Sequence, residues 1–177
     1  MPQIPAKERI LSTPEQIEGR VRAALDELGI AGWEWIEIDP QYGDTADFCQ
    51  QYGYDLPHCA NTIIVASKRG PAAFCAGIVR GCDRLDVNRR VRGLMGVSRV
   101  SFASAEETRE VTGMMIGGVT ALALPEGLPI YADMRLLEMD YIILGAGSRS
   151  GKLKTAPQEL GKLPGLEFID GLSLPAG

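Results

Sequence analysis

The stretch that decides the fold is GMMIGGVTALALPEGLPIYADMRLLEMDYIILGAG, residues 113–147. It holds the glycine pair Gly117 and Gly118 ahead of a short apolar run, a Leu-Pro turn, and an acidic strand end at Asp133. A second apolar strand then leads into a glycine-rich turn at 145–147. Because glycine lacks a Cβ, such turns bring bare backbone N–H groups up to a ligand. The pattern is typical of a fold that holds a small polar group or a developing oxyanion through its backbone.

The composition indicates one globular domain. The chain has 177 residues, of which 45% are hydrophobic and 23% are charged, enough for a sizeable core but not for two domains. The sequence contains no apolar run of the ~18 residues that a membrane span needs. Its first residues, MPQIPAKERILSTPEQ, lack the apolar core of a signal peptide. We therefore expect a single domain over 1–177, located in the cytoplasm.

Charge is spread unevenly along the chain. The net charge of −5 argues against a general nucleic-acid binder. Residues 68–99, the basic strip, nevertheless carry eight basic residues against two acidic ones. The basic members are Lys68, Arg69, Arg80, Arg84, Arg89, Arg90, Arg92 and Arg99. Such a strip can dock a short piece of phosphate backbone, or it is simply a solvated helix face.

The cysteines and the single histidine do not favour a metal site. Cys49, Cys59, Cys75 and Cys82 form no C-x-x-C pair, and His58 is the only histidine. Adjacent residues of a strand face opposite sides, so His58 and Cys59 are not expected to serve one site. We expect the cysteines to be structural and reduced, and no metal to be bound.

Two further sequence patterns bear on catalysis. The run 145–152 resembles a phosphate loop, but Ala146 stands where the first glycine belongs and Leu153 where a Ser or Thr would hold magnesium. It still offers amides together with Arg149, Lys152 and Lys154 for phosphate contact. A catalytic triad is not indicated, because no G-x-S-x-G elbow accompanies the single histidine.

Periodicity and turn signals predict a mixture of helices and hairpins without regular alternation, which indicates an α+β fold with a mixed sheet. Helices are predicted over 14–28, 45–52, 83–94, 104–112 and 157–160. The helix at 104–112 carries a capping box, with Ser104 as the cap and Glu107 three residues on. Strands are predicted over 33–38, 62–67, 73–79, 97–102, 119–124, 129–132 and 141–144.

The order of these segments resembles the YbaK/EbsC family, free-standing relatives of the editing domain inserted in bacterial prolyl-tRNA synthetases. The resemblance covers roughly residues 12–165. It is carried by 59–66, 97–104, 106–113, Gly117-Gly-Val-Thr120, Leu124-Pro125, Tyr131-Ala-Asp133 and 142–147. It implies a single compact domain with a curved mixed β-sheet flanked by helices. It also implies hydrolysis of the ester that joins a wrong amino acid to the 3′ end of tRNA, with no cofactor.

The resemblance also implies the site. In the family a G-x-x-x-P segment lines the amino-acid pocket and supplies backbone amides, while a lysine at the start of the strand 61–66 holds the 3′-terminal nucleotide and the ester. Here the lysine position is Asn61 and the proline position is Ala121. The implied catalytic residues are Asn61, Gly117, Gly118 and Val119. The implied substrate-binding residues are Thr120, Ala121, Asp133, Gly145, Gly147 and Ser148, and Arg89, Arg90 and Arg92 are the tRNA-binding candidates.

Three functions follow from this site. The first is a trans-editing aminoacyl-tRNA deacylase, whose partners are the acceptor end of a mischarged tRNA and an aminoacyl-tRNA synthetase, with no membrane or DNA involved. Asparagine cannot supply positive charge, and Lys68 lies seven residues further along the strand, roughly 23 Å away at ~3.3 Å per residue. The second is therefore a module that binds tRNA or a synthetase without chemistry. The third is hydrolysis of another small ester in the same pocket.

Overall fold

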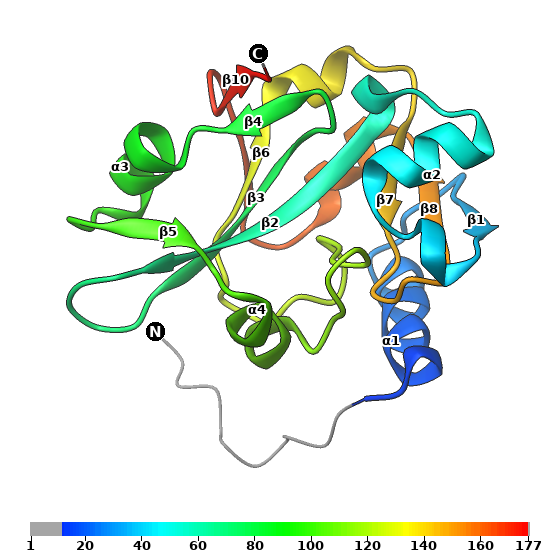
Figure 1. The fold of residues 1–177 in the computed structure, drawn as a ribbon, viewed down its shortest axis with the longest axis horizontal. Helices are drawn as coiled ribbons and strands as arrows, with labels where there is room; N and C mark the ends of the chain where they lie inside the picture. Colours follow the sequence, from blue (N-terminus) through cyan, green and yellow to red (C-terminus); the bar gives the residue numbers. More distant parts are fainter. Residues whose placement is uncertain (1–11, 177) are drawn as a thin grey trace.

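An eight-stranded mixed sheet forms the centre of the computed structural model, which describes residues 12–176 (Figure 1). Its strand order is β1-β8-β7-β2-β3-β6-β9, and β5 pairs with the far end of β2. The strands are β1 Glu34–Glu37, β2 Cys59–Ser67, β3 Phe74–Arg80, β5 Val100–Phe102, β6 Ile130–Asp133, β7 Ile142–Gly145, β8 Gly151–Thr155 and β9 Leu166–Ile169. The pairs β2–β7, β3–β6 and β6–β9 are parallel and the others antiparallel, which confirms the predicted α+β fold with a mixed sheet.

A second, two-stranded sheet pairs β4, Asp83–Leu85, with β10, Ser173–Pro175. The helices are α1 Pro14–Glu27, α2 Thr45–Tyr52, α3 Arg92–Met95 and α4 Ala105–Thr112. Shorter helical turns are η1 Pro40–Tyr42, η2 Leu56–His58, η3 Val87–Val91, η4 Met134–Glu138 and η5 Pro157–Lys162. The capping box predicted at Ser104 is present, with its hydroxyl accepting from the Glu107 amide at 3.0 Å.

The two long faces of the sheet carry different helices because successive strand residues point to opposite sides. Ala60 of β2 packs in the same core cluster as Val21 and Leu25 of α1. Its neighbour Cys59 packs instead with Phe48 of α2. The face on the α2 side holds the candidate site.

The predicted helix over 83–94 is wrong in its first half. Asp83 to Leu85 form β4, because Leu85 pairs with Ser173 of β10 and fills the space beside Gly77. The Asp83 carboxylate accepts from Arg80 Nε at 2.7 Å. The helical turns begin only after Asp86, whose carboxylate caps the amide of Arg89.

The predicted strand over 119–124 is also wrong. Residues 113–129 contain neither helix nor strand, although Ala121 and Leu122 are buried in the core. Ala123 has a φ of 58°, a left-handed conformation that interrupts an extended chain. The apolar run is therefore a packed loop. In Figure 1 it lies between α4 and the β7–β8 edge of the sheet.

Candidate active site

Lys152, Gly145 and Asn61 lie in one row across three adjacent strands. Gly145 pairs with Lys152 in the antiparallel β7–β8 register. Asn61 follows Ala60, which is paired with Leu144 in the parallel β2–β7 register, so Asn61 lies beside Gly145. Side chains in such a row project from the same face. Lys152 and Asn61 therefore flank the bare backbone of Gly145 on the α2 side.

The segment 117–119 covers Gly145 closely. A Cβ on Gly145 would fall inside contact distance of the carbonyl oxygens of Gly118 and Val119, and a Cβ on Gly118 would collide with the Ser148 carbonyl. The Gly147 amide donates to Gly118 O at 2.6 Å. The two glycine turns thus interlock, and glycine is needed at 118 and 145 because backbone occupies the space of a side chain.

Three successive carbonyls of this segment are held by donors from the neighbouring 147–152 stretch. Ile116 O accepts from Arg149 Nη1 at 3.1 Å, Gly117 O accepts from Lys152 Nζ at 3.1 Å, and Gly118 O accepts from the Gly147 amide at 2.6 Å. These contacts orient three consecutive peptide planes.

The orientation of the carbonyls determines where the amides point. None of the described peptide bonds is cis, and in a trans peptide the N–H points away from the C=O. The Gly118 N–H donates to Met115 O at 2.9 Å and closes a tight turn. The amides of Gly117 and Val119 find no acceptor among residues 12–176. Two fixed, unpaired donors of this kind can bind a carbonyl oxygen or an oxyanion.

Lys152 is a buried cation behind this segment. Its side chain is 7% exposed, and Nζ donates to Gly43 O at 2.7 Å as well as to Gly117 O. Nζ also lies 5.6 Å from the centroid of the Phe48 ring. Burial lowers the pKa of Lys152 from 10.5, because desolvation disfavours the ammonium form.

Arg149 joins three separate segments. Its Nε donates to Pro40 O at 3.0 Å, and Nη1 donates both to Asp44 Oδ1 at 3.0 Å and to Ile116 O. Asp44 is the residue before α2, so the guanidinium connects the start of that helix to the glycine segment. Arg149 positions the turn rather than facing a ligand.

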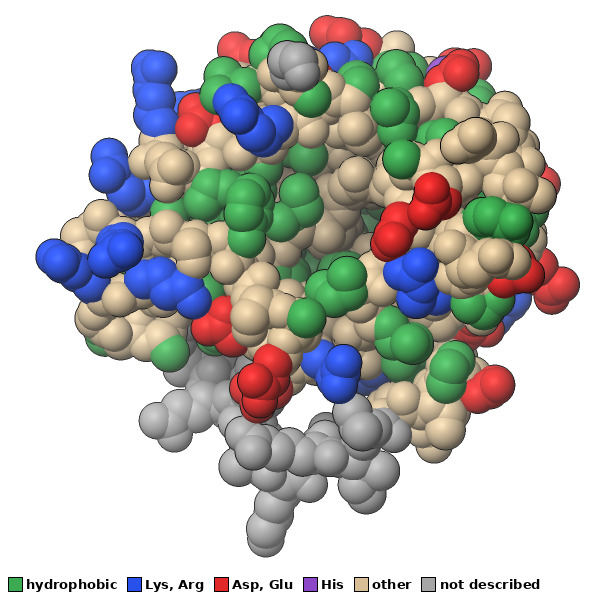
Figure 2. Space-filling view, in the orientation of Figure 1, with side chains coloured by type: hydrophobic (Ala, Val, Ile, Leu, Met, Phe, Trp, Pro, Cys, Tyr) green, Lys and Arg blue, Asp and Glu red, His purple; other side chains and the backbone are tan. Residues whose placement is uncertain are grey.

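Asn61 contributes a neutral donor to the same face. It is half-buried, and its Oδ1 accepts from Thr45 Oγ1 at 2.8 Å. The amide nitrogen Nδ2 has no acceptor among residues 12–176. Thr45 opens α2, so this hydrogen bond also ties the helix to β2. Figure 2 shows a hollow in the middle of this face, next to α2.

Other predicted site residues lie behind the turns. Thr120 and Ala121 are buried in the packed loop. Ser148 is buried, and its hydroxyl donates to Glu18 Oε1 at 2.5 Å. Gly147 packs against Ile17 of α1. The structure therefore brings Asn61, Gly117, Gly118, Val119 and Gly145 together and places this second group in supporting positions.

Asp133 lies apart from them. It is buried, and its carboxylate accepts from the Arg135 amide at 3.0 Å and from the Ser173 hydroxyl of β10. Both oxygens are thus used in capping η4 and joining β10 to the sheet.

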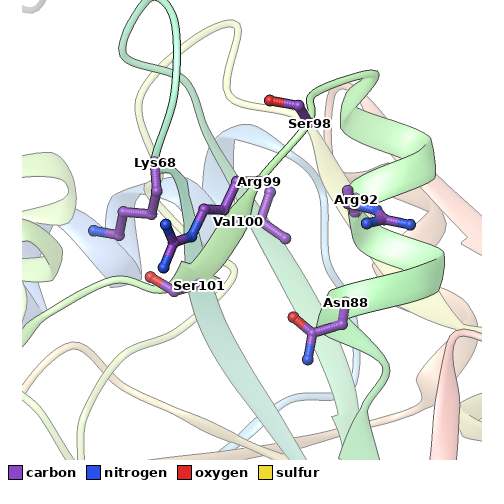
Figure 3. Close-up of a pocket in the computed structure, with 7 residues that line it drawn as sticks. All are labelled: Lys68, Asn88, Arg92, Ser98, Arg99, Val100 and Ser101. Carbon is purple, nitrogen blue, oxygen red and sulfur yellow. The ribbon is translucent and has the colours of Figure 1, made fainter.

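The three candidate arginines differ in their surroundings. Arg92 lines a pocket of about 580 Å³ together with Lys68 and Arg99 (Figure 3). Arg90 Nη2 donates to Asp170 O at 2.7 Å, and Arg89 is exposed. This pocket lies at the end of β2 opposite to Asn61.

Sequence reasoning missed the role of Lys152, which it noted only as a phosphate contact in the loop. The usable signal is the alternation Gly-Lys-Leu-Lys-Thr over 151–155, which is typical of a strand. Leu153 of this strand is buried in the main core. That strand was not predicted, and only its pairing with β7 brings Lys152 to Gly117.

The described residues offer no metal site and no membrane helix. Within residues 12–176 no three His, Cys, Asp or Glu side chains are grouped to hold a metal ion. None of the helices in this range is long and apolar enough to cross a membrane. His58 lies 3.0 Å from Asp140, whereas Cys59 Sγ lies 3.4 Å from Cys49 Sγ, so the adjacent pair points to different surroundings.

Known proteins are similar to this chain in sequence and in fold. The chain is 22% identical over 108 residues to EbsC of Enterococcus faecalis (strain ATCC 700802 / V583), a candidate Cys-tRNA(Pro)/Cys-tRNA(Cys) deacylase. The match covers 61% of this chain and 63% of the relative, so the chain spans a little under two thirds of that protein's length.

Two crystal structures are similar over most of the chain. One is of a candidate trans-editing enzyme for prolyl tRNA synthetase, with a TM-score of 0.76 and 26% identity, covering 94% of this chain and 99% of that one. The other is of the hypothetical protein APE2540, with a TM-score of 0.76 and 26% identity, covering 88% and 99%. Residues 39–163 match the family model described as the aminoacyl-tRNA editing domain. The chain therefore belongs to the aminoacyl-tRNA editing domain family, which confirms its resemblance to YbaK and EbsC.

Proposed function

We propose that this protein hydrolyses the ester of mischarged aminoacyl-tRNA in trans. The observation that carries the proposal is the pair of unpaired amides at Gly117 and Val119, next to the carbonyls of residues 116–118, which are held by donors from 147–152. Preorganised backbone donors stabilise the oxyanion that forms when an ester is attacked. No nucleophilic side chain is required for this chemistry, which suits a site built mainly from glycine backbone.

In the proposed reaction the ester carbonyl oxygen accepts from the Gly117 and Val119 amides. A water molecule attacks the carbonyl carbon, and the bond to the ribose oxygen breaks as the intermediate collapses. The ribose oxygen takes up the proton that the water gives away, with the neighbouring 2′-hydroxyl as a relay. Free amino acid and uncharged tRNA are the products.

Asn61 and Lys152 have separate tasks in this scheme. The free Nδ2 of Asn61 orients the terminal nucleotide or the attacking water. Lys152 holds the Gly117 carbonyl and keeps a positive charge within the site wall, which favours the developing oxyanion. We propose a single editing domain over the whole chain, acting in the cytoplasm where tRNA is charged, with a synthetase as a further partner.

Deacylation of a panel of mischarged tRNAs tests the proposal. The likeness to EbsC makes Cys-tRNA(Pro) and Cys-tRNA(Cys) the first substrates to measure. Turnover that depends on the enzyme and on the tRNA portion supports it. Failure on every member of the panel at high enzyme concentration contradicts it.

Because the side chain of Asn61 is neutral, a second candidate function is a module that binds tRNA acceptor ends or a synthetase without turnover. Binding without hydrolysis across the same panel distinguishes it. The third candidate, hydrolysis of another small ester, predicts turnover of free esters regardless of RNA.

A further inference from the structure

The basic pocket at the far end of β2 is built from three parts of the chain (Figure 3). Lys68 follows β2, Asn88 and Arg92 come from η3 and α3, and 98–101 lead into β5. In Figure 3 Lys68, Arg99 and Ser101 lie on one side, and Arg92 and Asn88 project from the helical turns on the other. The residues that line the pocket include three basic side chains and no acidic one.

Two guanidinium groups of this pocket are unused. Arg92 and Arg99 are both exposed, and neither guanidinium group has a hydrogen-bond or ion-pair partner among residues 12–176. Lys68 is paired with Glu107 at 3.1 Å. Elsewhere Arg80 is held by a carboxylate at 2.7 Å as part of the fold. Unpaired guanidinium groups beside hydroxyl and amide side chains match the oxygens of a phosphate diester.

The distance between this pocket and the candidate active site indicates which part of a bound RNA lies at the pocket. Asn61 lies near the start of β2 and Lys68 directly follows its end, so the two are seven residues apart, roughly 23 Å at ~3.3 Å per residue. A stacked strand rises about 3.4 Å per nucleotide, so the span corresponds to about seven nucleotides. That is longer than the unpaired 3′ end of a tRNA, so the backbone at the pocket belongs to the paired acceptor stem.

The basic side chains and the hollow beside α2 lie on one face of the molecule. Figure 2 shows Lys and Arg side chains gathered over α3, β5 and the β2–β3 hairpin, on the same face as the hollow beside α2. An acceptor stem that lies along α3, β5 and the β2–β3 hairpin would place its 3′ end at the hollow.

We propose that Lys68, Arg92 and Arg99 bind a phosphate of the acceptor-stem backbone while the ester lies at Gly117 and Val119. The inference rests on the proposed deacylase function. The contact positions the RNA without reading its sequence, because phosphates carry no base identity.

The test compares two substrates that share the same aminoacylated end. One is a minihelix with the full acceptor stem, and the other is a short oligonucleotide with only the unpaired end. The double variant Arg92→Gln/Arg99→Gln should raise KM for the minihelix on the order of tenfold, leave kcat unchanged, and leave the short substrate unaffected. The salt dependence of minihelix binding should also become shallower by about one to two phosphate contacts.

The matched control is Arg20→Gln/Arg109→Gln, which removes the same charge from exposed positions on α1 and α4. An unchanged KM for the minihelix, or equal losses in the control, overturns the proposal. If no deacylation is found at all, fluorescence anisotropy with uncharged minihelix and short strand replaces the kinetic measurement. Weaker binding of the minihelix alone in the Arg92/Arg99 variant then supports the pocket even though the proposed function has failed, and no difference refutes it.

Discussion

Lys152 and Asn61 project from one face of the sheet on either side of Gly145, and the Lys152 ammonium group donates to the Gly117 carbonyl of the segment that covers that glycine. The position where the family resemblance places a lysine is thus neutral, while a buried ammonium group arrives from β8. Its partners are the backbone carbonyls of Gly43 and Gly117, so we infer that the charge helps to hold Gly117 in place.

Removing this ammonium group tests that role. We expect Lys152→Met to lower the single-turnover deacylation rate on the order of 10²-fold, because the site wall loses its positive charge and the peptide between the two free amides loses its fixed orientation. Two buried carbonyls also lose their donor, at a cost of about 1–3 kcal/mol in the free energy of unfolding. Urea unfolding and single-turnover kinetics measure the two effects. Lys154→Met, two residues along the same strand, is the control, and an equal rate loss there would contradict the role of Lys152.

The depressed pKa of Lys152 predicts opposite trends for activity and stability. The folded pKa lies below the unfolded value of 10.5, so between these two values the native state binds fewer protons than the unfolded chain. The unfolding free energy of wild type relative to Lys152→Met should therefore rise with pH across this window. Over the same window the deacylation rate, corrected for uncatalysed alkaline hydrolysis, should fall as the ammonium group deprotonates. In Lys152→Arg, which stays charged, this alkaline decline should disappear; an identical decline would argue against Lys152 as its source.

The amide of Val119 can be removed selectively. Proline has no backbone N–H, whereas alanine keeps it. We expect Val119→Pro to reduce kcat by roughly 10²–10³-fold, with Val119→Ala close to wild type. Circular dichroism confirms that both variants are folded before their rates are compared. Similar rates for the two would show that this amide is not an oxyanion donor.

Replacing Asn61 by lysine, the residue that the family resemblance implies at this position, distinguishes a catalytically active site from one that has lost its activity. Asn61→Lys would place a second cation two strands from Lys152, about 10 Å apart at ~4.8 Å per strand spacing. It would also lose the hydrogen bond from Thr45 to the asparagine oxygen. We expect activity to fall about tenfold or more, because like charges disfavour the protonated form of Lys152. A gain in activity would instead support the reading of a binding module that has lost its chemistry.

The space above Gly145 provides a prediction for stability. Gly145→Ala would drive a methyl group into the carbonyls of Gly118 and Val119, which are backbone atoms that cannot rotate away. We expect a loss of about 1–3 kcal/mol in the free energy of unfolding, together with displacement of the amide pair. Gly19→Ala on α1, where nothing lies within 4 Å, should raise stability by roughly 0.5–1 kcal/mol. Thermal unfolding of the two variants compares them, and equal shifts would contradict this packing.

Local signals in the sequence predicted the parts of the fold that depend on neighbouring residues. The cap at Ser104 and the glycine turns belong to this group, since turn and cap chemistry is decided within a few residues. The strand β8 was not predicted because its glycine and lysines form a strand only when they pair with β1 and β7. The segment 119–124 was mistaken for a strand because apolar composition alone does not distinguish a packed loop from a buried strand.

The same limit applies to the site. The order of the motifs predicts Asn61 and Gly117 as site residues. Lys68 is too far along the strand from Asn61 to supply the cation, so the sequence indicates no replacement for the lysine. A residue far along the chain can be adjacent in the sheet, and Lys152 is brought to Gly117 by register rather than by sequence proximity.

The donors that hold the glycine segment all come from residues 147–152, through Gly147, Arg149 and Lys152. This six-residue stretch therefore holds the carbonyls of residues 116–118, which belong to the candidate site and lie about 30 residues earlier in the chain. Exchanging residues 147–152 between relatives would change the geometry of the candidate site without altering a residue proposed to contact the substrate. Engineering of specificity can accordingly begin behind the pocket.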